Sequence, residues 1–125
     1  ATAGELCVSD GTTDGTKVIH EFQPGMASAE IRGLKATDSH LLIIANGVDN
    51  GVDTGHCLWS LDVSNLETTI VYDPWSGTGN NSDAGFYGEL FSSAEMVLFV
   101  ADNGLNGHEL HMWSPLSITD EWLIW

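Results

Sequence analysis

The sequence predicts an all-β protein built from antiparallel repeats of about 52 residues. Leu6, Leu58 and Leu110 follow one another at intervals of 52 residues. Neighbouring positions keep that frame without a gap, pairing Asp10 with Asp62, Thr16 with Thr68, Val18 with Ile70 and Ile19 with Val71. A period near 50 residues in a β-rich pattern is typical of propeller blades. We therefore expect a β-propeller or part of one, and a two-sheet β-sandwich is the alternative.

Short apolar or β-branched runs between Gly- and Asp-rich turns supply four expected strands in the first unit. The turn at 10–15 separates the first two strands. These strands cover residues 5–9, 16–22, 31–36 and 41–45. The last of them, Leu-Leu-Ile-Ile-Ala, is apolar at every position, which predicts a strand covered on both faces.

The second unit repeats this order, and the third begins it again. Matching strands are expected at 57–61, 69–73, 86–91 and 97–101, and then at 109–113 and within 118–125. We therefore divide the single domain, 1–125, into units 1–46, 47–101 and 102–125, the last one incomplete. Four strands in each unit suit a propeller blade, in which one sheet stacks on the next. The final strand ends on four apolar residues, an exposed edge that predicts partner sheets or partner chains.

The net charge of −15 narrows the possible partners. Such an acidic surface repels phosphate backbones, which excludes nucleic-acid binding, and it disfavours anionic membrane surfaces. No window reaches the roughly 18 apolar residues of a membrane span, so no membrane insertion is expected. The charge fits an extracellular or cell-surface protein that meets divalent cations or a salty medium.

Two cysteines, Cys7 and Cys57, leave two interpretations open. Either both are small buried hydrophobic residues, as free cysteines often are, or they form a disulfide between neighbouring units.

Residues 5–16, Glu-Leu-Cys-Val-Ser-Asp-Gly-Thr-Thr-Asp-Gly-Thr, resemble the bacterial ELWxxDGT repeat, with Cys7 in place of its usual Trp. The resemblance is strong over residues 4–16. Later copies diverge, although Leu58, Trp59 and Asp62 keep part of the motif. It implies a propeller-like array in secreted or surface proteins and no enzymatic activity.

Acidic, Gly-rich turns are candidates for calcium. Asp10 and Asp14 flank one turn, and Asp49 and Asp53 lie in the stretch 46–53. Calcium binds six to eight oxygens, which such loops can supply. The alternative is that these side chains hydrogen-bond their own turns.

A sugar site is suggested by the long polar loop after the sixth expected strand. Trp75 could stack on a pyranose, with Asn80 and Asp83 as hydrogen-bonding partners. Alternatively, the indole packs on its own blade. The five histidines show no zinc spacing, and no nucleophile motif is present, so we expect no enzyme. The sequence thus favours a non-enzymatic, self-assembling module, adhesin-like in character, whose partners are copies of itself or neighbouring repeats. A carbohydrate-binding module is the alternative.

Overall fold

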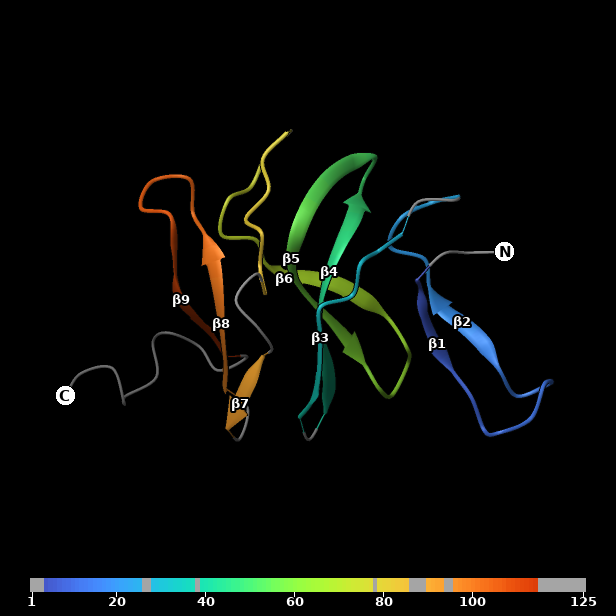
Figure 1. The fold of residues 1–125 in the computed structure, drawn as a ribbon. Helices are drawn as coiled ribbons and strands as arrows, with labels where there is room; N and C mark the ends of the chain where they lie inside the picture. The colour runs from blue at the N-terminus through green and yellow to red at the C-terminus, as the bar shows by residue number, and fades with distance from the viewer. Residues whose placement is uncertain are drawn as a thin grey trace.

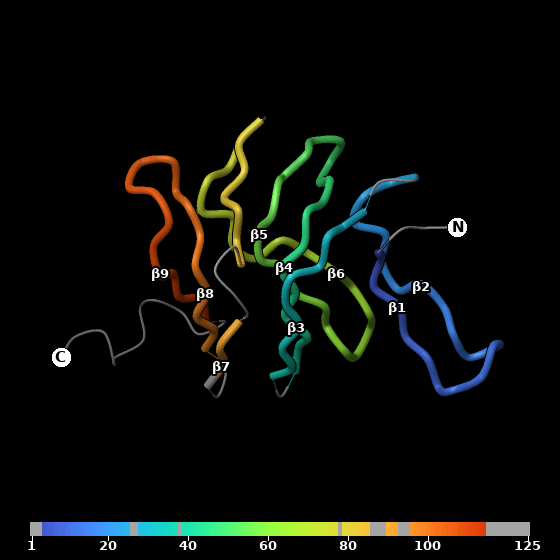
Figure 2. The backbone as a smooth tube through the Cα atoms, viewed as in Figure 1, coloured from blue at the N-terminus to red at the C-terminus, as the bar shows by residue number. Residues whose placement is uncertain are grey.

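The computed structural model describes residues 4–25, 28–37, 39–77, 79–85, 90–93 and 96–114. Three antiparallel sheets lie side by side in chain order (Figures 1 and 2). The N-terminal sheet pairs β1 (Leu6–Val8) with β2 (Lys17–His20). The central sheet is a meander of β3 (Gly33–Ala36), β4 (His40–Asp49), β5 (Val52–Asp62) and β6 (Thr68–Tyr72). The C-terminal sheet orders β7 (Phe91–Ser93), β8 (Met96–Asp102) and β9 (His108–Trp113).

The all-β, antiparallel prediction is confirmed, since strands are the regular elements of the described ranges. Every strand found there overlaps one expected from the sequence. The expected residues 86–89 and the last strand, 118–125, lie outside the described residues. There are three sheets in the described part of the chain and not the two of the sandwich alternative. None of the residues placed in the structure forms a helix long and apolar enough to cross a membrane.

The sheets do not coincide with the sequence units predicted above. The central sheet takes its first two strands mainly from unit 1–46 and its last two from unit 47–101. A two-residue turn at Asn50 and Gly51 joins the halves, with φ of 51° and 81°. Positive φ at both positions matches a type I′ turn, whose twist suits a tight hairpin. The expectation that each unit forms its own sheet is therefore wrong. The sheets are offset from the sequence units by about half a repeat.

The 52-residue spacing recurs in the hydrogen-bond register. In the N-terminal sheet Cys7 pairs with Val18, and in the central sheet Trp59 pairs with Ile70, each 52 residues later. Both pairs of strands also shift register at the same place, just before Cys7 and just before Trp59. The hairpins β4–β5 and β8–β9 also match in register, with equivalent residues 52 apart between β5 and β9 and 56 apart between β4 and β8. Their matched pairs include Ile44 with Leu58 and Val100 with Leu110.

Two apolar layers separate the three sheets. The first layer includes Leu6, Ile43, Ala45, Cys57, Trp59 and Leu61, and lies between the N-terminal and central sheets. The second includes Leu42, Ile44, Leu58, Val97, Phe99 and Ala101, and lies between the central and C-terminal sheets. Ile43 and Ile44 are consecutive, fully buried and in different layers. The prediction that residues 41–45 are covered on both faces is therefore confirmed.

Candidate functional site

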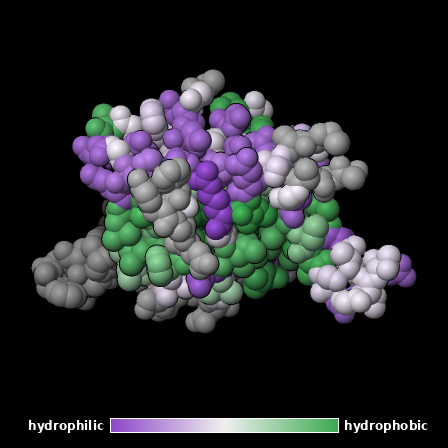
Figure 3. Space-filling model, viewed as in Figure 1, coloured by the Kyte–Doolittle hydropathy of each residue, from purple (hydrophilic) through white to green (hydrophobic). Residues whose placement is uncertain are grey.

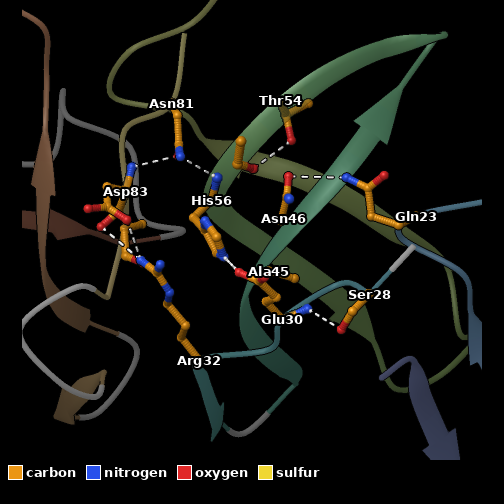
Figure 4. Close-up of polar contacts among 12 residues, drawn as sticks. Gln23, Ser28, Glu30, Arg32, Ala45, Asn46, Thr54, His56, Asn81 and Asp83 are labelled. Carbon is orange, nitrogen blue, oxygen red and sulfur yellow. Dashed lines mark hydrogen bonds and ion pairs between the residues drawn. The ribbon is translucent and has the colours of Figure 1, made fainter. Parts of the chain in front are cut away.

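A row of polar side chains crosses the end of the molecule at which the β4–β5 and β8–β9 hairpins turn. Figure 3 shows hydrophilic residues gathered at this end and hydrophobic residues below them on the face in view. Figure 4 shows the contacts within the row, whose residues come from the loops leading into β3 and β7 and from β4 and β5.

An acid–histidine pair occurs at matching places in two successive sheets. Glu30 Oε2 lies 3.2 Å from His56 Nε2, and Asp83 Oδ2 lies 3.2 Å from His108 Nε2. Both acids adopt positive φ, 45° and 51°, although neither is glycine. Each is held by a side chain two residues earlier: the Glu30 amide donates to Ser28 Oγ, and the Asp83 amide donates to Asn81 Oδ1. The strained turn is thus a repeated feature that places a carboxylate on a histidine.

Asp83 also links the central sheet to the C-terminal sheet. Arg32 precedes β3, and its Nη1 donates to Asp83 Oδ1 at 2.6 Å and to the Ala84 carbonyl at 3.1 Å (Figure 4). Burial alone raises the pKa of Asp83, but hydrogen bonds from Arg32 and His108 outweigh it and hold that pKa below its usual value. The carboxylate is therefore charged and engaged on both sides.

His56 is the most enclosed member of the row, with 4% of its surface exposed. Burial and the Arg32 charge lower its pKa, against the opposing effects of Glu30 and Asp83. Its contact with Glu30 has the distance of an ion pair but lacks hydrogen-bond geometry, and Nδ1 has no hydrogen-bond partner in the described part of the chain. Its backbone amide donates to Asn81 Oδ1. This geometry ties a loop to a strand.

The structure gives each of the three predicted sugar ligands its own contacts. Trp75 is half-buried and packs on the β8–β9 hairpin so closely that a Cβ on Gly104 would lie 2.7 Å from its Cε2 atom. Asn80 lines a pocket of about 170 Å³ that also includes Asp53 and Asn46. Asp83 is engaged as described above. Trp75 thus packs on a hairpin, Asn80 lines a pocket, and Asp83 joins two sheets through Arg32 and His108.

The four candidate calcium ligands lie in two separate turns. Asp10 Oδ1 accepts hydrogen bonds from the Thr12 amide and hydroxyl at 2.9 and 2.6 Å, and these bonds lower the pKa of Asp10. Asp14 belongs to the same exposed turn. Asp49 and Asp53 lie on opposite strands of the β4–β5 hairpin, where Asp53 Oδ1 accepts from the Gly55 amide.

These contacts are those of turn capping. Asp62, 52 residues after Asp10, accepts the same two bonds from Ser64. Among the described residues no group of three or more His, Cys, Asp or Glu side chains is arranged to hold a metal ion.

Both cysteines are free thiols, so the disulfide that the sequence left open is not formed in this structure. Cys7 is exposed on the N-terminal sheet, whereas Cys57 is buried in the first apolar layer. Burial raises the pKa of the Cys57 thiol to about 12. The alternative of two buried residues therefore holds for Cys57 alone.

A second pocket was not anticipated from the sequence. It has a volume of about 360 Å³ and lies between the central sheet and Trp113, the last residue of β9. Its lining includes His40, Ser60, Asp62, Glu67, Thr69 and Trp113. These residues come from four strands and one turn, so no contiguous motif signals the pocket. The one available signal was Trp113, which occupies the repeat position of Leu61.

An apolar face on the C-terminal sheet is the third candidate. Phe91, Leu110 and Met112 are 66%, 67% and 46% exposed. Strand alternation places Leu98 and Val100 beside them, because Leu98 pairs with Met112 and Val100 pairs with Leu110. We call these five residues the β9 face. Exposed apolar patches on soluble proteins commonly mark interaction sites.

Comparison with protein-family models, with curated proteins and with solved structures found no match to this chain. The resemblance to the ELWxxDGT repeat therefore stays a prediction.

Proposed function

We propose that this chain is a non-enzymatic extracellular module that assembles with copies of itself by stacking sheets face to face, in the manner of propeller blades. The observation that carries the proposal is the β9 face. The repeated register and the ELWxxDGT resemblance support a blade-like array.

The interior of the molecule illustrates how such a face is used. Leu58, in the central sheet, occupies the same register position as Leu110, and it is fully buried against the C-terminal sheet. Leu110 is 67% exposed. Fully burying a leucine contributes about 1.5–3 kcal/mol, so covering the β9 face would be favourable. A further sheet stacked there would continue an interface that the chain already makes twice.

Charge opposes this association at low salt. Each copy carries a net charge of −15, and exposed charges are screened over about 10 Å at 0.1 M ionic strength but about 3 Å at 1 M. Association should therefore strengthen as salt is added. That dependence separates apolar stacking from a contact held by exposed ion pairs, which salt weakens.

Sedimentation velocity over a range of protein and NaCl concentrations tests the proposal. The wild-type chain should form oligomers that grow with salt, and Leu110→Asp should remain monomeric. Leu105→Asp is the matched control, because Leu105 is 87% exposed in the loop between β8 and β9 and lies outside the β9 face. A folded wild-type monomer under all these conditions would exclude self-assembly.

A second candidate function, carbohydrate binding, is favoured by the pocket beside Trp113. Its lining combines an indole with hydroxyl, carboxylate and imidazole groups, a combination suited to a pyranose. Asp62 and Glu67 would repel acidic sugars, so the ligand class is neutral or cationic.

Isothermal titration with neutral oligosaccharides and with a uronic-acid oligosaccharide tests this candidate. Binding of the neutral sugars alone, lost in Trp113→Ala and weakened in Glu67→Gln, is expected. The absence of any binding to the folded wild-type chain would rule the candidate out.

A further inference from the structure

We infer that copies of this chain associate head to tail, with the β9 face of one copy against the outward face of the N-terminal sheet of the next. The inference rests on the proposed self-assembly and adds its polarity. Head-to-tail contacts close into rings or extend into filaments, whereas a contact of one face with itself stops at a dimer.

The two internal layers always join faces of two different kinds. From the central sheet the second layer takes Leu42, Ile44 and Leu58, and from the C-terminal sheet it takes Val97, Phe99 and Ala101. In register terms the first set matches Leu98, Val100 and Leu110, which are residues of the β9 face. The second set matches Leu41, Ile43 and Ala45, which face the N-terminal sheet. We call a face with the residues of the first set a face of the first kind, and a face with the residues of the second set a face of the second kind. Each internal layer joins one face of each kind.

The N-terminal sheet presents the second kind of face outward. Its inward residue Leu6 belongs to the first layer, so alternation points Cys7 away from that layer. Cys7 pairs with Val18, and their repeat equivalents Trp59 and Ile70 pack against the preceding sheet. Cys7 is exposed, and Val18 is 43% exposed.

The described residues thus carry complementary faces on their first and last sheets. A copy placed with its N-terminal sheet on the β9 face would put Cys7 and Val18 where Trp59 and Ile70 lie in the first layer. Both internal layers repeat this arrangement, and neither contains a pairing of like faces. Head-to-tail stacking is accordingly the polarity that continues the molecule's own pattern.

Mixing two single variants tests the polarity. Val18→Asp places a charge on the outward face of the N-terminal sheet and leaves the β9 face intact. Leu110→Asp places a charge on the β9 face and leaves the N-terminal sheet intact. Each variant alone should sediment as a monomer, whereas an equimolar mixture should form a one-to-one dimer and nothing larger. Circular dichroism of each variant, compared with the wild type, first establishes that both are folded.

Thiol labelling gives an independent readout, because it probes the N-terminal sheet without introducing a charged residue there. The rate at which a maleimide reacts with Cys7 should fall at least about tenfold, by exclusion of water from the contact, as the wild-type chain associates. In Leu110→Asp the rate should not depend on protein concentration.

The outcomes separate the two proposals. A monomeric wild-type chain removes self-assembly and its polarity together. Oligomers that persist in Val18→Asp, with Cys7 still reactive, would overturn head-to-tail stacking alone and assign a contact between two β9 faces.

Discussion

Replacing either of two consecutive isoleucines should destabilise the chain by a similar, large amount. Ile43 and Ile44 are both fully buried, and they belong to different apolar layers. Truncating a buried isoleucine to alanine typically costs about 2–5 kcal/mol. Ile43→Ala and Ile44→Ala should therefore each lose that much free energy of unfolding. In a strand with one solvated face, only one of the two would do so.

Val100 provides the internal comparison, because it holds the register position of Ile44 in the C-terminal sheet but is only half-buried. At about 0.8 kcal/mol per buried CH₂, and with part of the side chain in water, Val100→Ala should cost about 1 kcal/mol. Urea unfolding followed by circular dichroism, at low salt and low protein concentration, gives these values from the transition midpoints. A cost below about 1 kcal/mol for either isoleucine would refute the claim that β4 is covered on both faces.

Three further predictions concern charge, thiols and metal. Asp83→Asn should lower stability by about 1 kcal/mol near neutral pH, a modest figure because the ion pair with Arg32 is partly exposed. Since folding lowers the pKa of Asp83, that difference should be fully present above the unfolded pKa and vanish as pH falls through the folded one, as acid titration of both proteins would show. In a thiol assay on the native monomer Cys7 should react and Cys57, with its raised pKa, only after urea is added; two fast thiols would contradict the burial of Cys57. Calcium or EDTA should leave the melting temperature unchanged, because Asp10 is occupied within its own turn; a rise with calcium would restore the cation site.

The sequence was sufficient for the strands and insufficient for the way they are grouped. Apolar and β-branched runs mark strands whichever sheet they join, and an unbroken apolar run such as 41–45 indicates cover on both faces. A repeat period gives the distance between equivalent residues but not where one sheet ends. The Asn50-Gly51 dipeptide, a strong hairpin signal, could have supplied that phase. The calcium hypothesis treats the same dipeptide as part of an acidic loop.

The candidate sites were less predictable because they join residues far apart in the sequence. The sequence suggests Asp83 as a sugar ligand, but its partner Arg32 precedes it by 51 residues, next to the first strand of the central sheet. The Trp113 pocket likewise depends on two sheets meeting, which no local pattern encodes. Recognising the β9 face requires strand alternation together with the exposure of each side chain in the folded chain.

The half-repeat offset explains how a decayed sequence repeat can still specify a regular stack. Because the β4–β5 hairpin crosses the boundary between sequence units, that boundary lies inside the central sheet, where residues 54–61 are all buried. Each sheet therefore depends on two successive units, and neighbouring units are joined by backbone pairing as well as by side-chain packing. The residue type can then differ at one repeat position, as it does between Trp59 and His111, while the hydrogen-bond register between the strands stays the same. The β9 face has Leu98, Val100 and Leu110 at positions whose equivalents are buried one repeat earlier. Apolar side chains at matched positions suit a face that a partner covers, and they support the proposed stacking at this end of the molecule.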